Sequence, residues 1–412
     1  MDALSYENSR SLRRRAEALF PGGHHLSSRP LLGPDAAPLY LERGRGCRVW
    51  DVDGHEYVDY FMAFGPFLLG YADEEVDAAA IHQLRRGGLL SLSHPLHLEF
   101  LERLLARFPG AEMGMFFKTG SEATTAALRI ARRATGRRVV ARCGYHGWHD
   151  WCLPLAAEVP AGLDAQVLEF AANVASLEAL LTAHAGQVAA VIVAPEMVRA
   201  PSVEVFAGLA GLARAHGAVF VMDEVKTALR IAPGSMQRRY GVVPDLTTVS
   251  KALGNGWPIA AVIGARAVMA SAAGMHLSAT YHGDTAAMAA AIAVLDIVER
   301  DEVAEHVWRL GARLIDGLNA AAARHGVAAE AYGEPLPPMP FLRFDRGEAR
   351  DAFFAACVAR GVLLHPRHMW FISRAHTDAD IERTLEVADE AMGIAGALSR
   401  DAAVTVGVAL HP

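Results

Sequence analysis

Short apolar runs alternate with helical patterns through the middle of this chain, from about residue 65 to residue 285. Buried parallel strands are nearly continuous apolar runs, whereas amphipathic helices repeat their apolar positions three and four residues apart. Alternation of the two predicts an α/β fold with a largely parallel sheet flanked by helices. The expected strands are residues 115–117, 139–141, 188–193, 219–222, 247–250 and 259–263.

The two ends of the chain predict a smaller α+β domain. Residues 8–20 have the pattern of an amphipathic helix, and residues 49–60 that of a hairpin with Asp53 and Gly54 in its turn. Two helices, 285–300 and another to about 325, precede short strands near 341–344 and 361–364. A last helix begins near Thr377, whose hydroxyl can cap it.

Composition limits the class of protein. The 412 residues are 52% hydrophobic, which is enough for a large core, and a chain of this length predicts two domains. A net charge of -7 with dispersed basic residues argues against a nucleic-acid groove. No apolar run has membrane-spanning length and no secretion signal opens the chain. Four cysteines without paired or metal-finger spacing predict reduced thiols in a cytoplasmic protein.

Two opposite charges lie at the carboxyl ends of candidate strands. Asp223 ends the apolar run of residues 219–222, and Lys251 follows the apolar-to-polar segment of residues 246–250. Open α/β sheets bind ligands at the carboxyl ends of their strands. Pyridoxal phosphate (PLP) chemistry needs such a pair, because a lysine amine forms the Schiff base and an aspartate keeps the pyridine nitrogen protonated. A lysine at a strand end is by itself more often a solvated charge, so this interpretation needs further motifs.

A second motif lies upstream. Residues 118–124 follow the apolar stretch 113–117 and precede a helical pattern that includes Ala123, Ala127 and Ile130. The backbone N–H groups of Gly120 and Ser121 would therefore face an anion with the helix dipole behind them. By itself this turn could equally be a simple helix N-cap.

Four motifs in this order and spacing resemble the class III aminotransferases, which are fold-type I PLP enzymes. They are residues 120–124, 144–147, 223–225 and 250–252. Within that class the chain is similar to glutamate-1-semialdehyde aminomutase and its aminotransferase relatives. The likeness includes residues 21–23, 50–60, 65–66 and 375–378, and so covers roughly residues 15 to 395. Four ordered motifs are far more specific together than each would be alone.

The resemblance implies PLP as cofactor and assigns its contacts. Lys251 would form the Schiff base, Asp223 would hold the pyridinium, Tyr145 would stack on the ring and Val225 would pack on the other face. Thr280 matches the family threonine that reaches the phosphate of the neighbouring subunit, which implies a homodimer with shared active sites. The expected cofactor-binding residues are Gly120, Ser121, Tyr145, His146, Asp223, Val225, Lys251 and Thr280. Glu224 is expected to make a structural contact.

The resemblance also implies a domain organisation. Residues 1–64 form an N-terminal segment that contributes to the small domain and the dimer interface. Residues 65–304 form the large PLP-binding domain, residues 305–400 the C-terminal small domain and residues 401–412 a tail. We therefore expect the fold-type I architecture of a large and a small domain.

Substrate contacts are less specific. Arg29 follows Pro21 by eight positions, as does the arginine that holds the substrate carboxylate in the aminomutase, but it could also be a surface residue. Residues 365–370 depart from the aminomutase pattern and supply Arg367, His368 and Trp370, which could bind an anionic or aromatic substrate or simply pack.

Two other departures bear on the reaction. Where the family often has Glu-Pro, this chain has Ala194-Pro195 and carries its carboxylate at Glu196. The loop after residues 145–151 is shorter than the lid that retains the intermediate in the aminomutase. A shorter lid favours release, and hence transamination between an amine or amino acid donor and a carbonyl acceptor.

The main hypothesis is therefore a PLP-dependent aminotransferase. An aminomutase, or an amino-acid racemase or epimerase, could use the same lysine. Metal-dependent hydrolysis is suggested only by His146 with His149 and His365 with His368, and Gly147 and Pro366 interrupt both pairs; we expect no metal. A binding protein that has lost catalysis would not need both Lys251 and Asp223.

Overall fold

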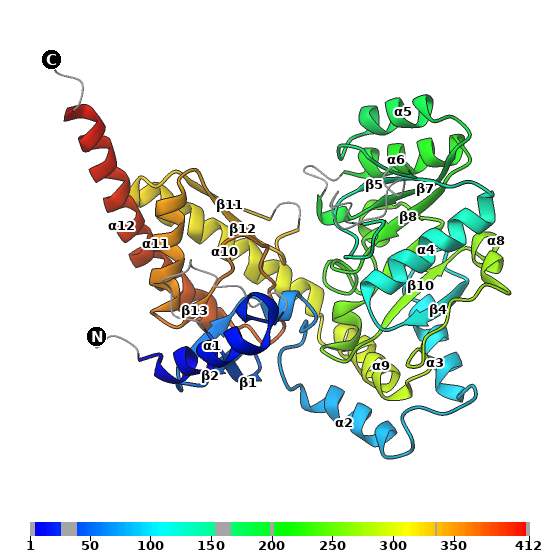
Figure 1. Ribbon diagram of the computed structural model, residues 1–412, viewed down its shortest axis with the longest axis horizontal. Helices are drawn as coiled ribbons and strands as arrows, with labels where there is room; N and C mark the ends of the chain where they lie inside the picture. Colours follow the sequence, from blue (N-terminus) through cyan, green and yellow to red (C-terminus); the bar gives the residue numbers. More distant parts are fainter. Residues whose placement is uncertain (1–4, 26–38, 153–165, 198–201, 334–335, 409–412) are drawn as a thin grey trace. The chain divides into compact units, whose positions relative to one another are not determined.

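The computed structural model describes residues 5–25, 39–152, 166–197, 202–333 and 336–408 (Figure 1). Its contacts divide the chain into two compact units. Unit 1 consists of Met1–Asp73 and His306–Pro412, and unit 2 of Glu74–Glu305. The two ends of the chain thus fold into one unit, and the long middle segment folds into the other.

The described part of unit 2 is built on a seven-stranded sheet. Strands β6, β5, β7, β8 and β9 are parallel neighbours, whereas β10 is antiparallel to both β9 and β4. The expected α/β fold with a mostly parallel sheet is therefore confirmed. In spatial order the strands are β4 (Met113–Phe117), β10 (Ala260–Gly264), β9 (Leu246–Val249), β8 (Val219–Asp223), β7 (Val188–Val193), β5 (Val139–Cys143) and β6 (Val167–Glu169).

The central strands are apolar because helices cover the sheet. Every residue of β5, β7, β8, β9 and β10 is buried. Helix α4 (Gly120–Thr135) packs across β4 and β7 to β10 through an alanine-rich face (Figure 1). The small side chains of this face let the helix lie close to the sheet, which fixes where its N-terminus points.

Caps define both ends of α4. Thr119 and Glu122 form a capping box, in which the Thr119 N–H donates to Glu122 Oε2 at 2.8 Å and the Glu122 N–H donates to Thr119 Oγ1 at 3.3 Å. At the other end, Gly136 has a φ of 69°, a left-handed conformation that suits glycine. The turn and helix start predicted in residues 118–124 are therefore confirmed, with Thr119 as the N-cap.

Other helices complete unit 2. Helix α6 packs on β8, and α9 packs on α2, α3 and the short η5 turn that follows β9. These elements are α2 (Glu74–Leu84), α3 (Pro95–Leu105), α5 (Val174–Ala183), η4 (Pro195–Met197), α6 (Val203–Ala215), α7 (Met236–Tyr240), η5 (Lys251–Gly254), α8 (Arg266–Met269), η6 (Ala270–Ala272) and α9 (Thr285–Arg300).

Unit 1 joins the two ends of the chain in a sheet of order β1-β2-β3-β13. The predicted hairpin is formed by β2 and β3, and β13, from the C-terminal part, pairs in parallel with β3. A separate hairpin pairs β11 with β12. The strands are β1 (Leu41–Arg45), β2 (Arg48–Asp51), β3 (Glu56–Asp59), β11 (Ala329–Tyr332), β12 (Phe341–Phe344) and β13 (Val362–Leu363).

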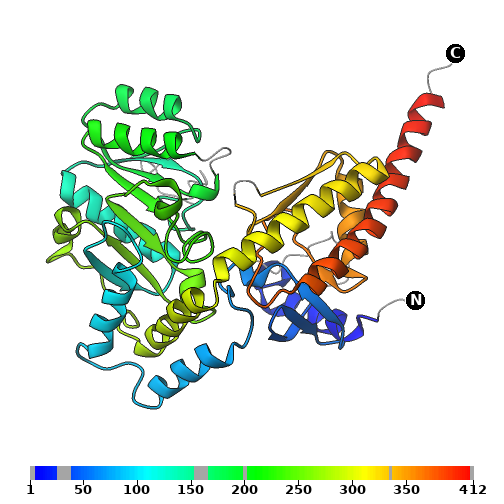
Figure 2. The same cartoon turned by 180° about the vertical axis from the view of Figure 1, so that it is seen from behind.

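Long helices pack beside these strands. Figure 2 shows α10 (yellow) running alongside α12 (orange to red), and arginines of α10 join the two: Arg309 to Asp378 at 2.6 Å and Arg313 to Glu382 at 2.7 Å. The helices of unit 1 are α1 (Glu7–Leu19), α10 (Val303–His325), α11 (Gly347–Val358) and α12 (Asp378–Val408), with short turns η1 (Pro21–Gly23) and η2 (Met62–Phe64). In the part of the chain that the structure describes, no helix is both long and apolar enough to cross a membrane.

Candidate active site

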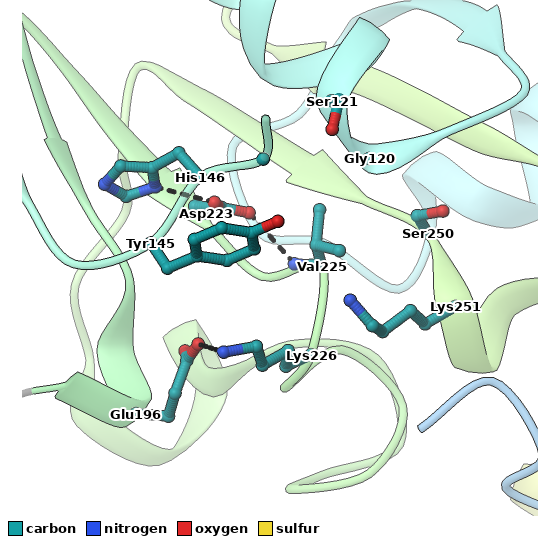
Figure 3. Close-up of a pocket in the computed structure, with 11 residues that line it drawn as sticks. Gly120, Ser121, Tyr145, His146, Glu196, Asp223, Val225, Lys226, Ser250 and Lys251 are labelled. Carbon is teal, nitrogen blue, oxygen red and sulfur yellow. Dashed lines mark hydrogen bonds and ion pairs between the residues drawn. The ribbon is translucent and has the colours of Figure 1, made fainter. Parts of the chain in front are cut away.

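The carboxyl ends of β8 and β9 bring the two charged residues of the sequence motifs into one pocket of unit 2. Asp223 is the last residue of β8, and Lys251 follows β9 after Ser250. Parallel neighbours end at the same edge of a sheet, so residues 28 positions apart in the chain share a site. The pocket is lined by Gly120, Ser121, Tyr145, His146, Gly147, Glu196, Asp223, Val225, Lys226, Ser250 and Lys251 (Figure 3).

The Asp223 carboxylate is buried and held by three donors. Oδ1 accepts hydrogen bonds from Thr248 Oγ1 at 2.9 Å and from the Val225 N–H at 3.2 Å. Oδ2 lies 2.7 Å from His146 Nδ1. Burial raises the pKa of Asp223, but the His146 and Thr248 contacts outweigh it and hold that pKa below its usual range. The side chain is therefore ionised and fixed in orientation.

His146 is the residue that most directly orients Asp223. Its ring is buried and stacks near Trp151, with ring centroids 6.0 Å apart and planes 16° from parallel. Its backbone carbonyl accepts a hydrogen bond from Thr124 Oγ1 of α4 at 2.7 Å. Helix α4 thereby fixes the loop that carries Tyr145 and His146.

Lys251 is held on a strained backbone. Its φ is 46°, in the left-handed region that non-glycine residues seldom adopt, at a cost of roughly 1–3 kcal/mol. The preceding Ser250 hydroxyl donates to the Ile259 carbonyl at 3.0 Å and ties the turn to the start of β10. Burial, with a further effect of nearby Lys226, lowers the pKa of Lys251, so this amine loses its proton more readily than an exposed lysine.

The start of α4 has the shape of an anion cradle. A Cβ at Gly120 would lie 2.8 Å from Val225 Cγ1, and one at Gly147, whose φ is 116°, would collide with Ser121. Glycine therefore keeps the backbone open beside the Ser121 hydroxyl at the positive end of the helix dipole. This geometry suits a phosphate group.

The donor set as a whole fits PLP. It offers a readily deprotonated amine, an ionised carboxylate fixed at a strand end, an aromatic ring at Tyr145 and a glycine-lined helix N-terminus. PLP has four features that match these groups in turn: an aldehyde carbonyl for the amine, a pyridine nitrogen for the carboxylate, a flat ring for the aromatic side chain and a phosphate for the helix N-terminus.

Several pocket residues were not among the cofactor contacts expected from the sequence. Lys226 Nζ lies 2.9 Å from Glu196 Oε1, and the two side chains are only 9% and 3% exposed. Thr248 holds Asp223. The register of β8 and β9 pairs Asp223 with Thr248, so an alignment of the two strand ends could have found this contact.

Glu224 makes the structural contacts that were expected. Its carboxylate is fully buried and accepts hydrogen bonds from the Ser235 hydroxyl and, at 2.7 Å, from the Met236 N–H. Burial raises the pKa of Glu224 to about 7, because these donors only partly offset the loss of water. The residue anchors the turn that follows Asp223 to the start of α7.

Other expected residues are not among those that line this pocket. Thr280 is exposed in unit 2, and Arg29 lies outside the described residues, as does the loop of residues 153–165. Arg367 is exposed in unit 1, and His368 Nδ1 lies 2.7 Å from the Met369 carbonyl oxygen. Trp370 is fully buried and donates from Nε1 to the His365 carbonyl at 2.8 Å, so it packs the interior of unit 1.

The histidine pairs make other contacts. His146 Nδ1 faces Asp223, and His149 Nδ1 lies 2.7 Å from Thr125 Oγ1. Among the residues that the structure describes, no group of three or more His, Cys, Asp or Glu side chains could hold a metal ion.

Comparison with known proteins shows which family this chain resembles. Residues 33–377 match the family model of class III aminotransferases. The 3-aminobutyryl-CoA aminotransferase of Cloacimonas acidaminovorans is 33% identical over 407 residues, 95% of this chain and 98% of that protein. A glutamate-1-semialdehyde 2,1-aminomutase of Chloroflexus aggregans is 33% identical, with 94% and 98% covered. FumI of Sphingopyxis sp. MTA144, solved as its PLP internal aldimine form, has a TM-score of 0.90 and 32% identity, with 96% and 98% covered.

Proposed function

This chain belongs to the class III aminotransferase family, a PLP-dependent group, and we propose that Lys251 is the lysine through which it transfers an amino group. The observation that carries this assignment is the meeting of Lys251, Asp223 and the start of α4 in one pocket. When bound there, PLP supplies a ring that accepts electrons from the substrate. The protein has to hold the ring, keep its nitrogen protonated and move a proton.

Each of these tasks has a candidate residue. The ionised Asp223 would pair with the ring nitrogen of bound PLP, and its fixed position would keep the positive charge there. Gly120, Ser121, Tyr145 and Val225 line the pocket. Gly120 and Ser121 would hold the phosphate, and Tyr145 and Val225 would contact the two ring faces. The Lys251 amine, displaced by the substrate amine, would accept the proton from the substrate Cα as general base and then give it up as general acid.

The substrates are a small amino donor and a carbonyl acceptor. We propose Arg29, Arg367 and His368 as candidate contacts for the substrate, since guanidinium and imidazole N–H groups can bind a carboxylate or another anionic group. Trp370 is buried in unit 1 and donates to the His365 carbonyl, so it supports the segment that carries Arg367 and His368.

An aminomutase is the second candidate, because the relatives include glutamate-1-semialdehyde 2,1-aminomutase at 33% identity. A racemase or epimerase would use the same lysine. These alternatives need no separate acceptor. Consumption of an amine with no carbonyl acceptor present would favour them, whereas a strict requirement for an acceptor supports transamination.

We further propose a cytoplasmic homodimer in which Thr280 of the partner subunit completes each site. The exposure of Thr280 supports this proposal, because a residue that serves another subunit must lie on the surface of its own. Exposed leucines of unit 2 could be covered by the second copy: Leu84, Leu89, Leu90, Leu92 and Leu98 are 41–84% exposed.

The lysine assignment can be tested by borohydride reduction of the PLP-loaded protein followed by peptide mapping. The chain has three lysines, Lys118, Lys226 and Lys251. We expect the pyridoxyl group on Lys251. A label on Lys226 or Lys118 would overturn the assignment, and Lys251→Ala should abolish labelling while the other two lysines remain.

A further inference from the structure

The loop that carries Thr280 has an exposed tip and an anchored base. Residues 278–281 are exposed, whereas residues 282–284 are half-buried and lead into α9. Asp284 caps that helix, since its Oδ1 accepts a hydrogen bond from the Ala286 N–H at 2.9 Å. An exposed tip is weakly ordered by itself, so the contacts of the base decide where Thr280 points.

Lys118, which directly precedes the capping box of α4, holds the base of this loop. Lys118 Nζ lies 2.7 Å from Asp284 Oδ2, and the two side chains are only 14% and 24% exposed. The same ammonium donates to the Pro258 carbonyl at 3.0 Å, in the connection from η5 to β10. Because acceptors from two separate segments hold it, the ammonium has a fixed position beside the loop.

His282 makes a second contact between the loop and the start of α4. Its Nδ1 accepts a hydrogen bond from the Ala279 N–H at 3.3 Å, so the proton of the neutral ring is on Nε2. Nε2 lies 3.5 Å from Glu122 Oε1 of the capping box. The ring also packs edge-on against Phe117, with ring centroids 4.9 Å apart. The base of the loop is therefore joined at two points to the segment that opens the anion cradle.

Lys118 does not line the pocket, and a partly exposed ion pair contributes little stability. We propose that Lys118, through Asp284, holds the loop in the position from which Thr280 reaches the PLP phosphate of the partner subunit. Lys118 is thus a positioning residue for the site of the other subunit. The inference rests on the homodimer and on the role of Thr280 in the proposed function.

Asp284→Asn tests this tether with little change of shape. The asparagine can keep the cap of α9 through its side-chain oxygen, but it then directs an NH2 group toward the Lys118 ammonium. The ion pair is lost, while the helix cap remains. We therefore expect an effect on PLP binding with little change in the stability of the fold.

Mixed dimers show in which site the effect occurs. Each contains one Lys251→Ala chain, so a single site forms the Schiff base, and its absorption band reports the PLP affinity of that site. With Asp284→Asn on the Lys251→Ala chain, this site receives Thr280 from the altered loop and should bind PLP about tenfold more weakly. With Asp284→Asn on the other chain, the altered loop serves the site without Lys251. The affinity should then equal that of a reference mixed dimer whose single substitution is Lys251→Ala.

Two further variants serve as controls. Lys118→Met on the Lys251→Ala chain should weaken PLP binding as much as Asp284→Asn does, and the two together should weaken it no more than either one. Arg103→Met removes another ion pair, 2.9 Å from Arg103 to Asp296, which joins α3 to a later turn of α9. On the Lys251→Ala chain it should leave the PLP affinity unchanged.

Two outcomes would overturn the inference. One is a PLP affinity that neither Asp284→Asn nor Lys118→Met changes, and the other is a loss that is equally large when Asp284→Asn lies on the chain that keeps Lys251. Failure of the proposed function looks different. In that case the reference mixed dimer forms no Schiff-base band, or Thr280→Asp leaves PLP binding unchanged.

Discussion

Asp223 and Glu224 are adjacent carboxylates whose surroundings drive them to opposite protonation states. The donors around Asp223, His146 first among them, hold its pKa below the usual range despite full burial. Burial prevails at Glu224 and raises its pKa to about 7. Neighbours in sequence can differ this much because successive side chains at a strand end point in opposite directions, one into the pocket and the other into the interior.

Asp223→Asn tests the role of the carboxylate. The amide has nearly the same shape, so the fold and part of the PLP binding should remain, but a neutral side chain cannot hold the pyridine nitrogen protonated. We expect exchange of the substrate Cα proton with deuterated water to slow at least about 100-fold, which corresponds to about 3 kcal/mol in the barrier. The measurement is NMR of the substrate with PLP-saturated enzyme.

The matched control for that experiment is Glu224→Gln, which neutralises the next carboxylate on the same strand end. Its exchange rate should stay close to that of the parent enzyme, because Glu224 contacts Ser235 and the Met236 N–H and does not line the pocket. Equal exchange rates in the Asp223→Asn and parent proteins would refute the assigned role of Asp223.

The raised pKa of Glu224 also predicts that the stability of the folded protein depends on pH. Its pKa in the folded protein, about 7, exceeds the ordinary value of 4.5, so the folded state binds a proton more tightly. The resulting stability is fully present below about pH 4.5 and is lost as the pH rises through about 7, a change on the order of 3 kcal/mol. Glu224→Gln should remove this dependence.

Thermal unfolding of the two proteins at pH 5 and pH 8 measures the effect. The parent protein should lose more stability than Glu224→Gln between these values, and Glu42→Gln, an exposed carboxylate of β1, should behave like the parent. A parallel pH dependence in all three proteins would show that Glu224 does not titrate in this window.

At the scale of the elements, α4 has two glycine ends with separate tasks. Gly120 opens the helix beside Val225 in the pocket, and Gly136 closes it in a left-handed conformation with open space around it. Glycine is required at position 120 because a Cβ would lie too close to Val225. At position 136 it is favoured because the backbone φ is positive.

A pair of alanine substitutions separates these tasks. In Gly120→Ala the new Cβ would lie 2.8 Å from Val225 Cγ1, so Val225 must shift into the pocket. We expect PLP to bind at least about tenfold more weakly, with little change in stability. Gly136→Ala should cost about 1 kcal/mol of stability and leave PLP affinity unchanged. Fluorescence titration with PLP and urea unfolding of both variants provide the check, and equal PLP affinities would exclude the cradle at Gly120.

At the scale of the whole molecule, each active site of the proposed dimer is built from residues of two chains. If Thr280 serves the partner subunit, a mixed dimer of Lys251→Ala and Thr280→Asp chains holds one site with both changes and one site with neither. The aspartate would repel the PLP phosphate by its charge. Each parent homodimer should be inactive or weak, whereas the mixed dimer should regain about half of the activity of the unmodified protein.

Coexpression with two affinity tags isolates the mixed dimer for this measurement. The control is a mixed dimer in which one chain carries both substitutions and the other carries neither. It should show little activity, because each of its two sites contains one defect. No recovery in the first mixed dimer would show that Thr280 acts within its own chain, and full activity of the Thr280→Asp homodimer would show that Thr280 has no role.

Much of this molecule follows from the sequence. The strand predicted at residues 188–193 matches β7 at both ends, and the helix predicted at 285–300 matches α9, because buried strands and helices impose their periods on the apolar residues. The motifs around Asp223 and Lys251 indicated the family, which the comparisons confirm. Helix and strand periods, and the identity of the reactive side chains, depend on residues close together in the sequence. A short stretch of sequence is therefore enough to predict them.

Other features depend on the tertiary structure. The apolar run of β10 did not reveal that this strand is antiparallel, since direction depends on the connection, and only residues 250–259 link it to β9. The three-residue β6 was too short to predict. The contact of Glu196 with Lys226, and the protonation of Glu224, depend on burial and on side chains from separate elements. Desolvation and charge pairing depend on distances between side chains that are far apart in the sequence. Only the folded structure determines these distances.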